Sequence, residues 1–487
     1  MKALFVSSEC APFVKTGGLA DVIGALPRAL ENHEIKVRIL LPAYRELTDI
    51  LKTGKQVLKI NDLFGGPASV VSVEAEGLQL LLLDACHLYD REGSIYQDKK
   101  GQDWPDNHLR FGALSFVGAK LAAEGIDGWQ PDVVNAHDWQ AGLVPAYLSQ
   151  MKKPVPPCVF TIHNIAFQGR FDSKLRVELG LEEKLFSQEG IEYFGDISFL
   201  KAGIALSDKI TTVSPTYASE LLSPEFGMGL EGLLAYRQKD LVGILNGVDL
   251  EVWNPETDPY IDANYSMRAL AGKKINRATI ESRFGLKPDK DRPIFCVVSR
   301  LTTQKGLDLL LECVGDLVEQ GGRLALLGSG EKWLEDGFVE AARQYQGSVG
   351  VIIGYDEPLS HLMQAGCDAI LIPSRFEPCG LTQLYGLRYG TLPVVARTGG
   401  LADTIIDAND AALAANCATG IQFYPVTRDA LTRAIFKACD FFKDKKLWQA
   451  MMRRAMRQPV SWDRSAGLYA KIYQELSAET KSKSPTK

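Results

Sequence analysis

The sequence lacks the cysteine and histidine patterns that mark disulfide-stapled or metal-centred proteins. Its nine cysteines are scattered, odd in number and never form a C-x-x-C pair, which argues against a disulfide framework and against a zinc site. Its six histidines show no H-E-x-x-H spacing. We therefore expect no metal and a chain that works in a reducing compartment, the cytoplasm.

Long apolar runs and an excess of positive charge are also missing. No apolar run reaches membrane-spanning length, and Met1 leads into a short strand without the apolar segment of a signal peptide. A formal net charge of −6 makes the chain a poor general ligand of nucleic acid or anionic membranes. We expect neither partner, and the composition favours no particular oligomeric state.

Several nucleotide-binding and hydrolytic motifs are absent as well. The chain has no G-x-x-x-x-G-K-[ST] loop and no G-x-G-x-x-G followed by an acidic residue. It has no pair of carboxylates at an obvious spacing for glycoside hydrolysis. These absences count against a P-loop NTPase, a dinucleotide-dependent oxidoreductase and a glycosidase.

What the sequence does contain is a regular alternation of short apolar runs and amphipathic helical patterns. This alternation predicts parallel βαβ units, and 487 residues suit two large domains. A proline- and aspartate-rich segment at 249–259 separates the halves, so we predict domains at 1–250 and 251–460, with 461–487 as a terminal helix and frayed tail. The predicted strands are 2–8, 34–41, 78–83, 131–135, 158–162, 209–213 and 241–245, then 293–298, 323–327, 349–353, 368–372 and 392–396. A polar stretch before residue 78 suggests hairpins, and residues 140–149 are predicted to form a helix.

A lysine- and glycine-containing loop, residues 15–22, joins the first predicted strand to the first helix. Gly17 and Gly18 allow a ligand to approach the backbone, and a helix N-terminus with free N–H groups favours an anion. Lys15 adds a positive charge and Asp21 an acceptor for hydroxyls. The alternative is an ordinary glycine turn. The same hexapeptide, Thr-Gly-Gly-Leu-Ala-Asp, recurs at 398–403, which favours one anion-binding loop in each domain.

Two further loops follow predicted strands of the second half. Arg300 and Lys305 follow the strand at 293–298 and could together hold one anion, or else be solvated loop cations. Glu377 follows the strand at 368–372, where it could accept sugar hydroxyls or simply mark the start of a helix. The N–H groups that follow it, at Cys379, Gly380, Leu381 and Thr382, could hold an anion at a helix N-terminus. The Cys379 thiol itself is predicted to be a small buried group.

Polar side chains also end strands of the first half. Asp138 lies in Ala136-His137-Asp138-Trp139-Gln140, His163 follows the strand at 158–162, and Asn246 follows the strand at 241–245. Such groups suit recognition of hydroxyls, although single histidines are more often structural. Tyr96 belongs to a polar stretch with other aromatics that can stack on sugar rings or pack a loop. Because ligands of parallel sheets bind at the carboxyl ends of strands, we expect all these loops to carry the chemistry.

Taken together, these motifs resemble the bacterial and plant glycogen and starch synthases that use ADP-glucose. The resemblance covers nearly the whole chain and rests on seven motifs in the family's order. These are residues 15–22, 137–140, 163–164, 246–249, 299–305, 376–381 and 398–401.

The resemblance implies a GT-B fold: two Rossmann-like α/β domains that face each other across a deep cleft, and a C-terminal helix that crosses back to the first domain. It implies transfer of glucose from ADP-glucose to the non-reducing end of an α-1,4-glucan such as glycogen, with retention, no metal and no cofactor. Closure of the domains on the donor would bring the two glycine loops together.

The resemblance also implies a role for each matching residue. Lys15 and the loop through Gly18 would contact the donor phosphate, and Arg300 with Lys305 would clamp the diphosphate. Glu377 would lie at the glucosyl site and His163 would bond the sugar. Asp138 and Asn246 would line the sugar and acceptor region.

One position departs from the wider pattern of retaining GT-B enzymes, which have a second glutamate eight residues after the first. Here that position is Tyr385, so no ribose contact is assigned to it. Three alternative functions remain open at the level of sequence. They are a GT-B transferase that uses UDP-glucose or another acceptor, an NAD-dependent oxidoreductase with two Rossmann domains, and a catalytically silent glucan-binding protein.

Overall fold

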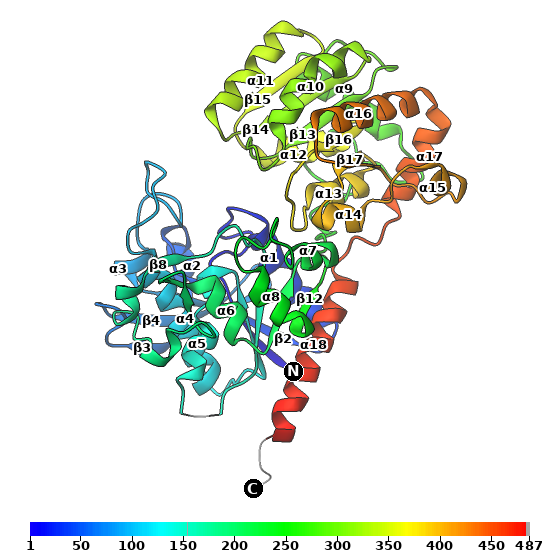
Figure 1. The fold of residues 1–487 in the computed structure, drawn as a ribbon. Helices are drawn as coiled ribbons and strands as arrows, with labels where there is room; N and C mark the ends of the chain where they lie inside the picture. Colours follow the sequence, from blue (N-terminus) through cyan, green and yellow to red (C-terminus); the bar gives the residue numbers. More distant parts are fainter. Residues whose placement is uncertain (153, 484–487) are drawn as a thin grey trace. The chain divides into compact units, whose positions relative to one another are not determined.

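The computed structural model describes residues 1–152 and 154–483, and the chain folds into two compact units (Figure 1). Unit 1 comprises Met1–Asn246 and Trp462–Lys487, and unit 2 comprises Gly247–Ser461. The predicted frayed tail continues instead as part of helix α18 (Asp463–Lys483), while residues 484–487 of that tail lie outside the described residues.

Unit 1 is built on a nine-stranded sheet in which seven neighbouring strands are parallel. Its central strands are buried along their whole length, as expected for a sheet covered by helices on both faces. In spatial order the strands are β12 (Leu241–Gly243), β11 (Lys209–Thr212), β7 (Cys158–Ile162), β6 (Val133–His137), β1 (Lys2–Val6), β2 (Lys36–Pro42), β5 (Leu78–Asp84), β4 (Ala68–Ala75) and β3 (Lys55–Ile60). The last two strands add an antiparallel edge, in agreement with the hairpins predicted before residue 78.

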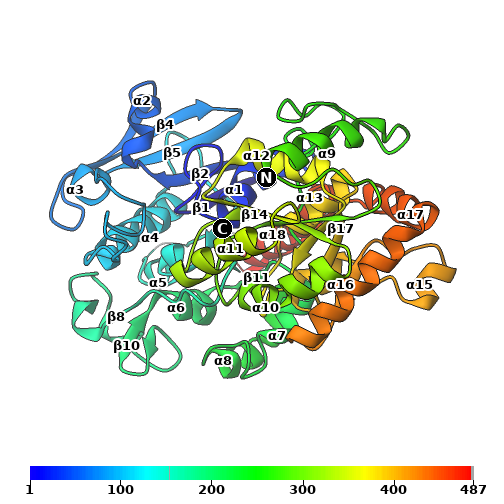
Figure 2. The ribbon, with the colours of Figure 1, turned by 90° about the horizontal axis from the view of Figure 1, so that it is seen from above.

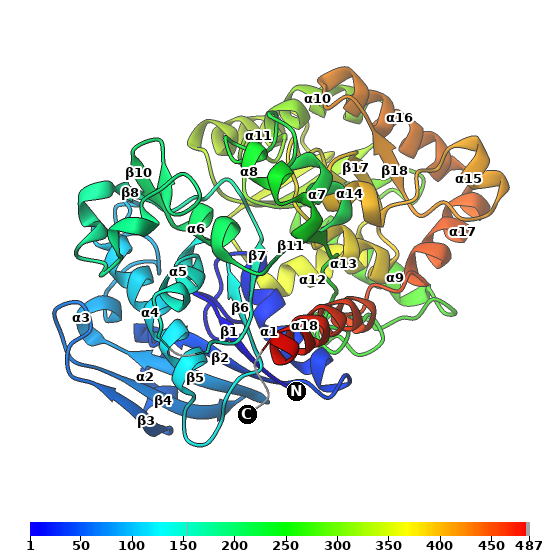
Figure 3. The same cartoon turned by 60° about the horizontal axis from the view of Figure 1, so that its bottom comes forward.

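Helices connect these strands. The main ones are α1 (Gly18–Glu31), α4 (Asn107–Glu124), α5 (Val144–Ser149), α6 (Phe199–Leu206), α7 (Pro215–Glu220) and α8 (Glu231–Tyr236), with short helices α2 (Thr48–Leu51) and α3 (Cys86–Tyr89). Helix α18 packs against α1 and β6 of the same unit (Figure 3). Its buried Tyr473 hydroxyl accepts a hydrogen bond of 2.7 Å from the Asn135 amide, so the last helix is tied into the core of unit 1.

Two features of unit 1 differ from the sequence prediction. The helix predicted at 140–149 is divided into a 3₁₀ turn, η2 (Trp139–Ala141), and helix α5, in which Pro145 occupies an early position that suits a new helix start. A small sheet of β8 (Arg170–Asp172), β10 (Asp196–Ser198) and β9 (Glu192–Tyr193) was not predicted, because two- and three-residue strands have no detectable period.

Unit 2 is a six-stranded sheet with parallel pairing throughout. Its order is β15 (Val349–Ile353), β14 (Arg323–Gly328), β13 (Ile294–Val298), β16 (Ala369–Ile372), β17 (Leu392–Ala396) and β18 (Ile421–Phe423). Figure 2 shows α16 beside α10, where the two helices pack. The helices are α9 (Ala271–Arg283), α10 (Leu307–Glu319), α11 (Lys332–Gln344), α12 (Glu357–Gly366), α13 (Thr382–Tyr389), α14 (Gly399–Thr404), α15 (Asp410–Ala414), α16 (Arg428–Lys443) and α17 (Lys445–Met456).

Each unit is thus a Rossmann-like domain of the expected α/β class. In both, most of the apolar runs that the sequence shows form buried parallel strands, whereas β12 is half-buried.

Candidate active site

In unit 2 the predicted site residues follow three neighbouring strands. Arg300 and Lys305 follow β13, the loop from Glu377 to Thr382 follows β16, and Gly399 follows β17. Since β13, β16 and β17 are adjacent and parallel, their carboxyl ends lie at one edge of the sheet. These loops of unit 2 therefore follow neighbouring strand ends, the place where ligands of parallel sheets bind.

The loops after β13 and β16 are tied to each other by backbone contacts. Gly306, at the start of α10, has a φ of 67°, and a Cβ there would lie 1.9 Å from the carbonyl oxygen of Pro373. Only glycine fits this position, because the backbone is left-handed and the two loops touch. The Arg375 N–H then donates to the Gln304 carbonyl at 2.9 Å. These contacts hold the two loops at a fixed separation.

The result is an ion pair between residues 72 positions apart in sequence. Lys305 Nζ lies 2.6 Å from Glu377 Oε2, and the Ser374 hydroxyl donates to the same oxygen at 2.9 Å. Both charged side chains are largely shielded, with 21% and 9% of their areas exposed. A lysine ammonium has three donors, so Lys305 retains donors for a ligand while it orients Glu377.

Arg300 differs from Lys305, because none of the residues that the structure describes pairs with its guanidinium. Arg300 is exposed, and no described residue accepts a hydrogen bond from its guanidinium. In the part of the chain that the structure describes, the N–H groups of Gly380, Leu381 and Thr382 at the start of α13 likewise have no backbone or side-chain acceptor. A free guanidinium and free N–H groups at a helix N-terminus are the groups that bind phosphate oxygens.

The second copy of the repeated hexapeptide packs directly beneath the Glu377 loop. A Cβ on Gly399 would lie 2.0 Å from the Glu377 carbonyl oxygen, and one on Gly400 would lie 2.2 Å from that of Cys379. The Gly400 N–H donates to the Glu377 carbonyl at 3.2 Å. Cys379 is buried in this packing, as predicted for its thiol. This copy is therefore a support for the Glu377 loop.

The first copy, in unit 1, lies in a different environment. The buried Glu9 carboxylate accepts the N–H groups of Thr16 at 2.7 Å and Gly17 at 3.1 Å, and also the Thr16 hydroxyl at 2.6 Å. The prediction that these N–H groups are free was therefore wrong for Thr16 and Gly17, because the protein supplies its own anion. Lys15 in turn forms an ion pair with Asp21 at 2.9 Å, and both are partly exposed.

Tyr96 is joined to this loop through Glu9. Its hydroxyl donates to Glu9 Oε1 at 2.6 Å and lies 2.9 Å from the Ser8 hydroxyl, while its ring packs near that of Phe111. Burial, followed by the nearby Glu9 charge, raises the Tyr96 pKa well above its ordinary value. Tyr96 therefore contributes to the loop as a hydrogen-bond donor.

Three polar residues form a buried cluster where β6 and β7 end. Asp138 Oδ1 accepts the His163 N–H at 2.7 Å and the Asn164 N–H at 3.3 Å. The His163 ring lies against that of His137, with 3.0 Å between His163 Nε2 and His137 Nδ1. Asp138 and His163 are each less than a tenth exposed.

Burial controls the charges in this cluster. It raises the Asp138 pKa to about 7, although the two N–H donors oppose this shift. It lowers the His163 pKa to about 3 and takes that of His137 well below its ordinary value. Both imidazoles are therefore neutral near pH 7. The cluster thus offers two neutral imidazoles beside a carboxyl group that is about half protonated at pH 7, in contrast to the ion pair of unit 2.

The backbone of Asp138 is strained. Its φ of 57° and ψ of −176° lie in a region that is almost confined to glycine. Such a conformation costs on the order of 1–3 kcal/mol and persists where surrounding structure enforces it. The position just after β6, where the carboxylate reaches the next strand's end, is consistent with a functional constraint.

Asn246 ends unit 1, just beyond β12, and is buried. Its Oδ1 is a buried acceptor without a partner among the described residues. It follows the strand two places from β7 in the sheet. Asp138, His163 and Asn246 thus all lie just beyond the ends of strands of unit 1, and Asn246 has a spare acceptor.

Tyr385 has a structural role in unit 2. Its ring stacks on Trp253 with 3.6 Å between ring centroids, and the opposite face of Trp253 stacks on His361 at 3.7 Å. Tyr385 is buried, so the position that holds a glutamate in the wider family pattern is occupied here by a packing residue.

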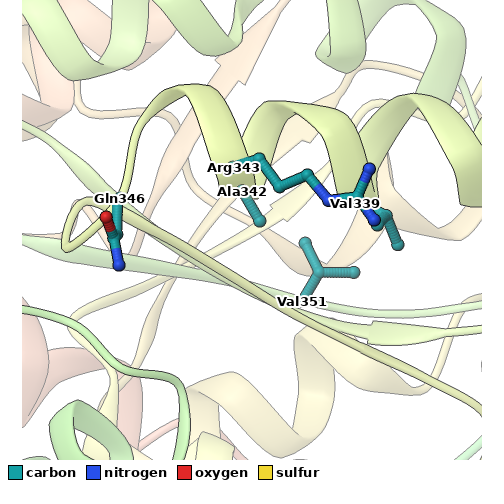
Figure 4. Close-up of a pocket in the computed structure, with 5 residues that line it drawn as sticks. All are labelled: Val339, Ala342, Arg343, Gln346 and Val351. Atoms are coloured by element: carbon teal, nitrogen blue, oxygen red, sulfur yellow. The ribbon is translucent and has the colours of Figure 1, made fainter.

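Other kinds of site receive little support. Residues 1–152 and 154–483 contain no group of three or more His, Cys, Asp or Glu that could hold a metal ion. Within the same residues, no helix is long and apolar enough to cross a membrane. A surface depression involves none of the residues above and is lined by Val339, Ala342, Arg343, Gln346 and Val351 (Figure 4).

Three residues that contact the candidate site residues were not predicted from the sequence. Glu9 and Ser374 each lie within three residues of the end of β1 or β16, and this position was the available signal. His137 is the last residue of β6, beside Asp138, within a motif that was singled out for its neighbour. Their partners, the Thr16 N–H, Glu377 and His163, are brought to them by the fold.

Comparison with known proteins identifies related families for both halves of the chain. Residues 2–236 match the family described as starch synthase catalytic domain, and residues 279–452 match glycosyl transferases group 1. A glycogen synthase of Roseobacter denitrificans is 63% identical over 98% of this chain and 99% of its own length, and glycogen synthase 1 of Rhizobium meliloti is 53% identical over 98% and 100%.

Solved structures agree. The catalytic domain of starch synthase IV from Arabidopsis thaliana, bound to ADP and acarbose, matches with a TM-score of 0.88 and 29% identity, over 98% of this chain and 99% of that one. A sucrose-phosphate synthase from Thermosynechococcus elongatus shares the fold alone, at 17% identity and a TM-score of 0.60. The chain has the GT-B fold and belongs to the glycogen and starch synthase family of glycosyltransferases.

Proposed function

We propose that this protein transfers glucose from ADP-glucose to the non-reducing end of an α-1,4-glucan, which elongates glycogen and releases ADP. Family membership supports glucosyl transfer in glycogen synthesis. The observation that carries the choice of a nucleoside diphosphate donor is the pair of cations in unit 2: Arg300 has no partner among the described residues, and Lys305 lies on the same loop. An ADP-bound relative of the same fold supports adenine as the base.

In this proposal Arg300 and Lys305 stabilise the leaving diphosphate. The bond between C1 of glucose and the phosphate oxygen breaks, and negative charge develops on that oxygen as the sugar gains oxocarbenium character. The guanidinium, the ammonium and the N–H groups at the start of α13, which have no acceptor among the described residues, are groups of the kind that neutralise such charge, which supports this role. The reaction then requires no metal and no cofactor.

The acceptor hydroxyl attacks the same face of the sugar, so configuration at C1 is retained. A bond forms between C1 and the acceptor oxygen, and the acceptor proton moves to the departing phosphate oxygen. Glu377, held by Lys305 and Ser374, supplies a fixed carboxylate near the positive charge of the sugar ring.

Unit 1 contributes groups suited to hydroxyls. His163 is a neutral imidazole near pH 7 because burial lowers its pKa to about 3, and Asn246 has an unpartnered buried oxygen. Asp138 orients the backbone of His163. The partly exposed Lys15 would contact the donor phosphate. The nine scattered cysteines, which include no C-x-x-C pair, are consistent with a reducing cytoplasm.

The test is release of ADP from ADP-glucose, measured with and without added glycogen. We expect release only with glycogen, and new linkages that an α-1,4-specific amylase cleaves. Release of UDP from UDP-glucose at an equal or greater rate would favour the rival donor. Glycogen binding without ADP release would favour a silent glucan-binding protein, and enhancement of NADH fluorescence on binding would favour an oxidoreductase.

A further inference from the structure

His137 is a buried imidazole to which the proposed mechanism gives no role. His137 is the last residue of β6 and has no exposed surface. The centroid of its ring lies 4.9 Å from that of Phe5. Its Nδ1 lies 3.0 Å from His163 Nε2. Its other nitrogen, Nε2, is buried without a hydrogen-bond partner among the described residues.

One proton must lie between the two rings. Burial lowers the pKa of each histidine, so both are neutral near pH 7 and each carries a single ring proton. A hydrogen bond of 3.0 Å then requires one nitrogen to donate and the other to accept. If His163 donated from Nε2, the proton of His137 would be on its Nε2, as a buried N–H without an acceptor.

The reverse arrangement leaves only a lone pair unpartnered. When His137 donates from Nδ1, its buried Nε2 carries no proton. Orphaned buried N–H groups are rarer in proteins than acceptors with an unused lone pair. The arrangement in which His137 is the donor is therefore favoured.

This choice determines what His163 presents to a ligand. With its Nε2 accepting from His137, the only ring proton of His163 lies on Nδ1. Among the described residues Nδ1 of His163 has no hydrogen-bond partner, and it is not one of the fully buried unpartnered atoms, so it remains accessible to a ligand. Asp138 holds the backbone N–H of the same residue at 2.7 Å. Two consecutive residues thus fix His163, one through its backbone and one through its ring.

We propose that His137 is a positioning residue, which holds His163 in the tautomer that carries its proton on Nδ1 and directs that N–H toward an oxygen of the bound sugar. The proton assignment stands on the 3.0 Å contact between the two rings, on the buried, unpartnered Nε2 of His137, and on the neutrality that burial gives both imidazoles. Its consequence for catalysis rests on the glucosyl transfer proposed above.

The assignment is tested by ¹⁵N NMR of the full chain with labelled histidine, since the protonated and bare nitrogens of a neutral imidazole resonate far apart. Six histidines keep the spectrum simple, and a His163→Gln variant identifies the signals of His163. We expect a proton on His163 Nδ1 from pH 6 to pH 8. A proton on Nε2 would overturn the proposal.

Two variants at position 137 separate positioning from packing. His137→Asn retains a donor, because the amide nitrogen and ring Nδ1 are both bonded to Cγ, whereas His137→Leu fills the site without a donor. We expect His137→Leu to lose the single His163 tautomer and to lower kcat/KM for the donor roughly 10- to 100-fold, as for other partners that orient a functional imidazole. His137→Asn should restore both readouts.

An unchanged tautomer and kcat/KM in a folded His137→Leu protein would overturn the proposal, as would equal losses in both variants. Thermal unfolding monitors folding, and if His137→Leu does not fold, the wild-type spectrum and the Asn variant still decide. Absence of ADP release by the wild type would instead overturn the proposed function, whatever the His163 spectrum shows.

Discussion

The hexapeptide Thr-Gly-Gly-Leu-Ala-Asp occurs once in each unit, and the two copies do different things. In unit 1 the turn is exposed, a Cβ on Gly17 would touch nothing, and Glu9 accepts its N–H groups. In unit 2 the turn is buried, and Gly399 and Gly400 lie against the backbone beneath Glu377. Identical residues thus form an open loop in one place and a packing support in the other.

The clusters beside the two copies differ in charge as well. In unit 1, burial raises the pKa of Asp138 to about 7, so this carboxyl group is about half protonated at pH 7, and it lowers the pKa of His163 to about 3, so the imidazole is neutral. In unit 2, Lys305 and Glu377 form an ion pair next to the unpartnered Arg300. Neutral groups recognise hydroxyls and cations recognise phosphates, so the comparison divides the proposed chemistry between sugar and leaving group.

Loss of a cation from unit 2 should have the largest effect. We expect Lys305→Ala to lower kcat roughly 10²- to 10³-fold, because one donor to the developing charge is lost and Glu377 loses its partner. Steady-state ADP release measures this. Lys332→Ala is a matched control, since Lys332 is exposed on α11 with only surface ion pairs. Near-normal turnover of a folded Lys305→Ala protein would remove the charged cluster from the mechanism.

Equivalent glycine substitutions test the two copies directly. Gly400→Ala would place a Cβ 2.2 Å from a backbone oxygen of the Glu377 loop, and a shift of about 1 Å in that loop should cost on the order of 100-fold in kcat/KM. Gly17→Ala has open space and a φ of −161°, which any residue adopts. We expect it to fold with wild-type thermal stability. Equal losses of stability in both variants would contradict the comparison.

The exposed loop of unit 1 should act on donor binding. We expect Lys15→Gln to raise the KM for ADP-glucose about tenfold, the effect of roughly 1.4 kcal/mol of lost binding, with glycogen affinity little changed. Asp21→Asn removes the same internal ion pair while it leaves the lysine charge. It therefore separates a contact with the donor from loop stability. An unchanged donor KM in Lys15→Gln would reduce this loop to a turn.

The raised pKa of Asp138 in unit 1 should make the free energy of unfolding depend on pH. The folded pKa of Asp138, about 7, lies above its ordinary value of 3.8, so the folded state binds more protons between these values and wild-type stability falls as pH rises through them. The asparagine of Asp138→Asn does not ionise, so the variant does not lose this stability as the pH rises. Urea unfolding should show the stability difference, variant minus wild type, growing by about 2–3 kcal/mol from pH 5 to pH 8. A constant difference would show that Asp138 is ionised when folded.

Much of this architecture could be predicted from local pattern. The buried runs at β6, β7 and β13 are apolar and bounded by turn residues, which is sufficient to identify parallel strands. The ends of these strands then place Arg300 and Glu377 at one edge of the unit 2 sheet and His163 at one edge of the unit 1 sheet. The sequence predicts one helix at 140–149, whereas the structure has a 3₁₀ turn followed by α5. Pro145 was the available signal for a new helix start.

The sequence by itself determined which loops carry cations, glycines and carboxylates, because those loops follow the apolar strands in order. Only the tertiary structure decided how each group is used. It placed Glu9 on the N–H groups of one hexapeptide and the backbone of Glu377 on the other, and it brought Lys305 to a carboxylate 72 residues away. Such pairings depend on contacts between distant segments, and burial then sets their charge, which local sequence does not encode.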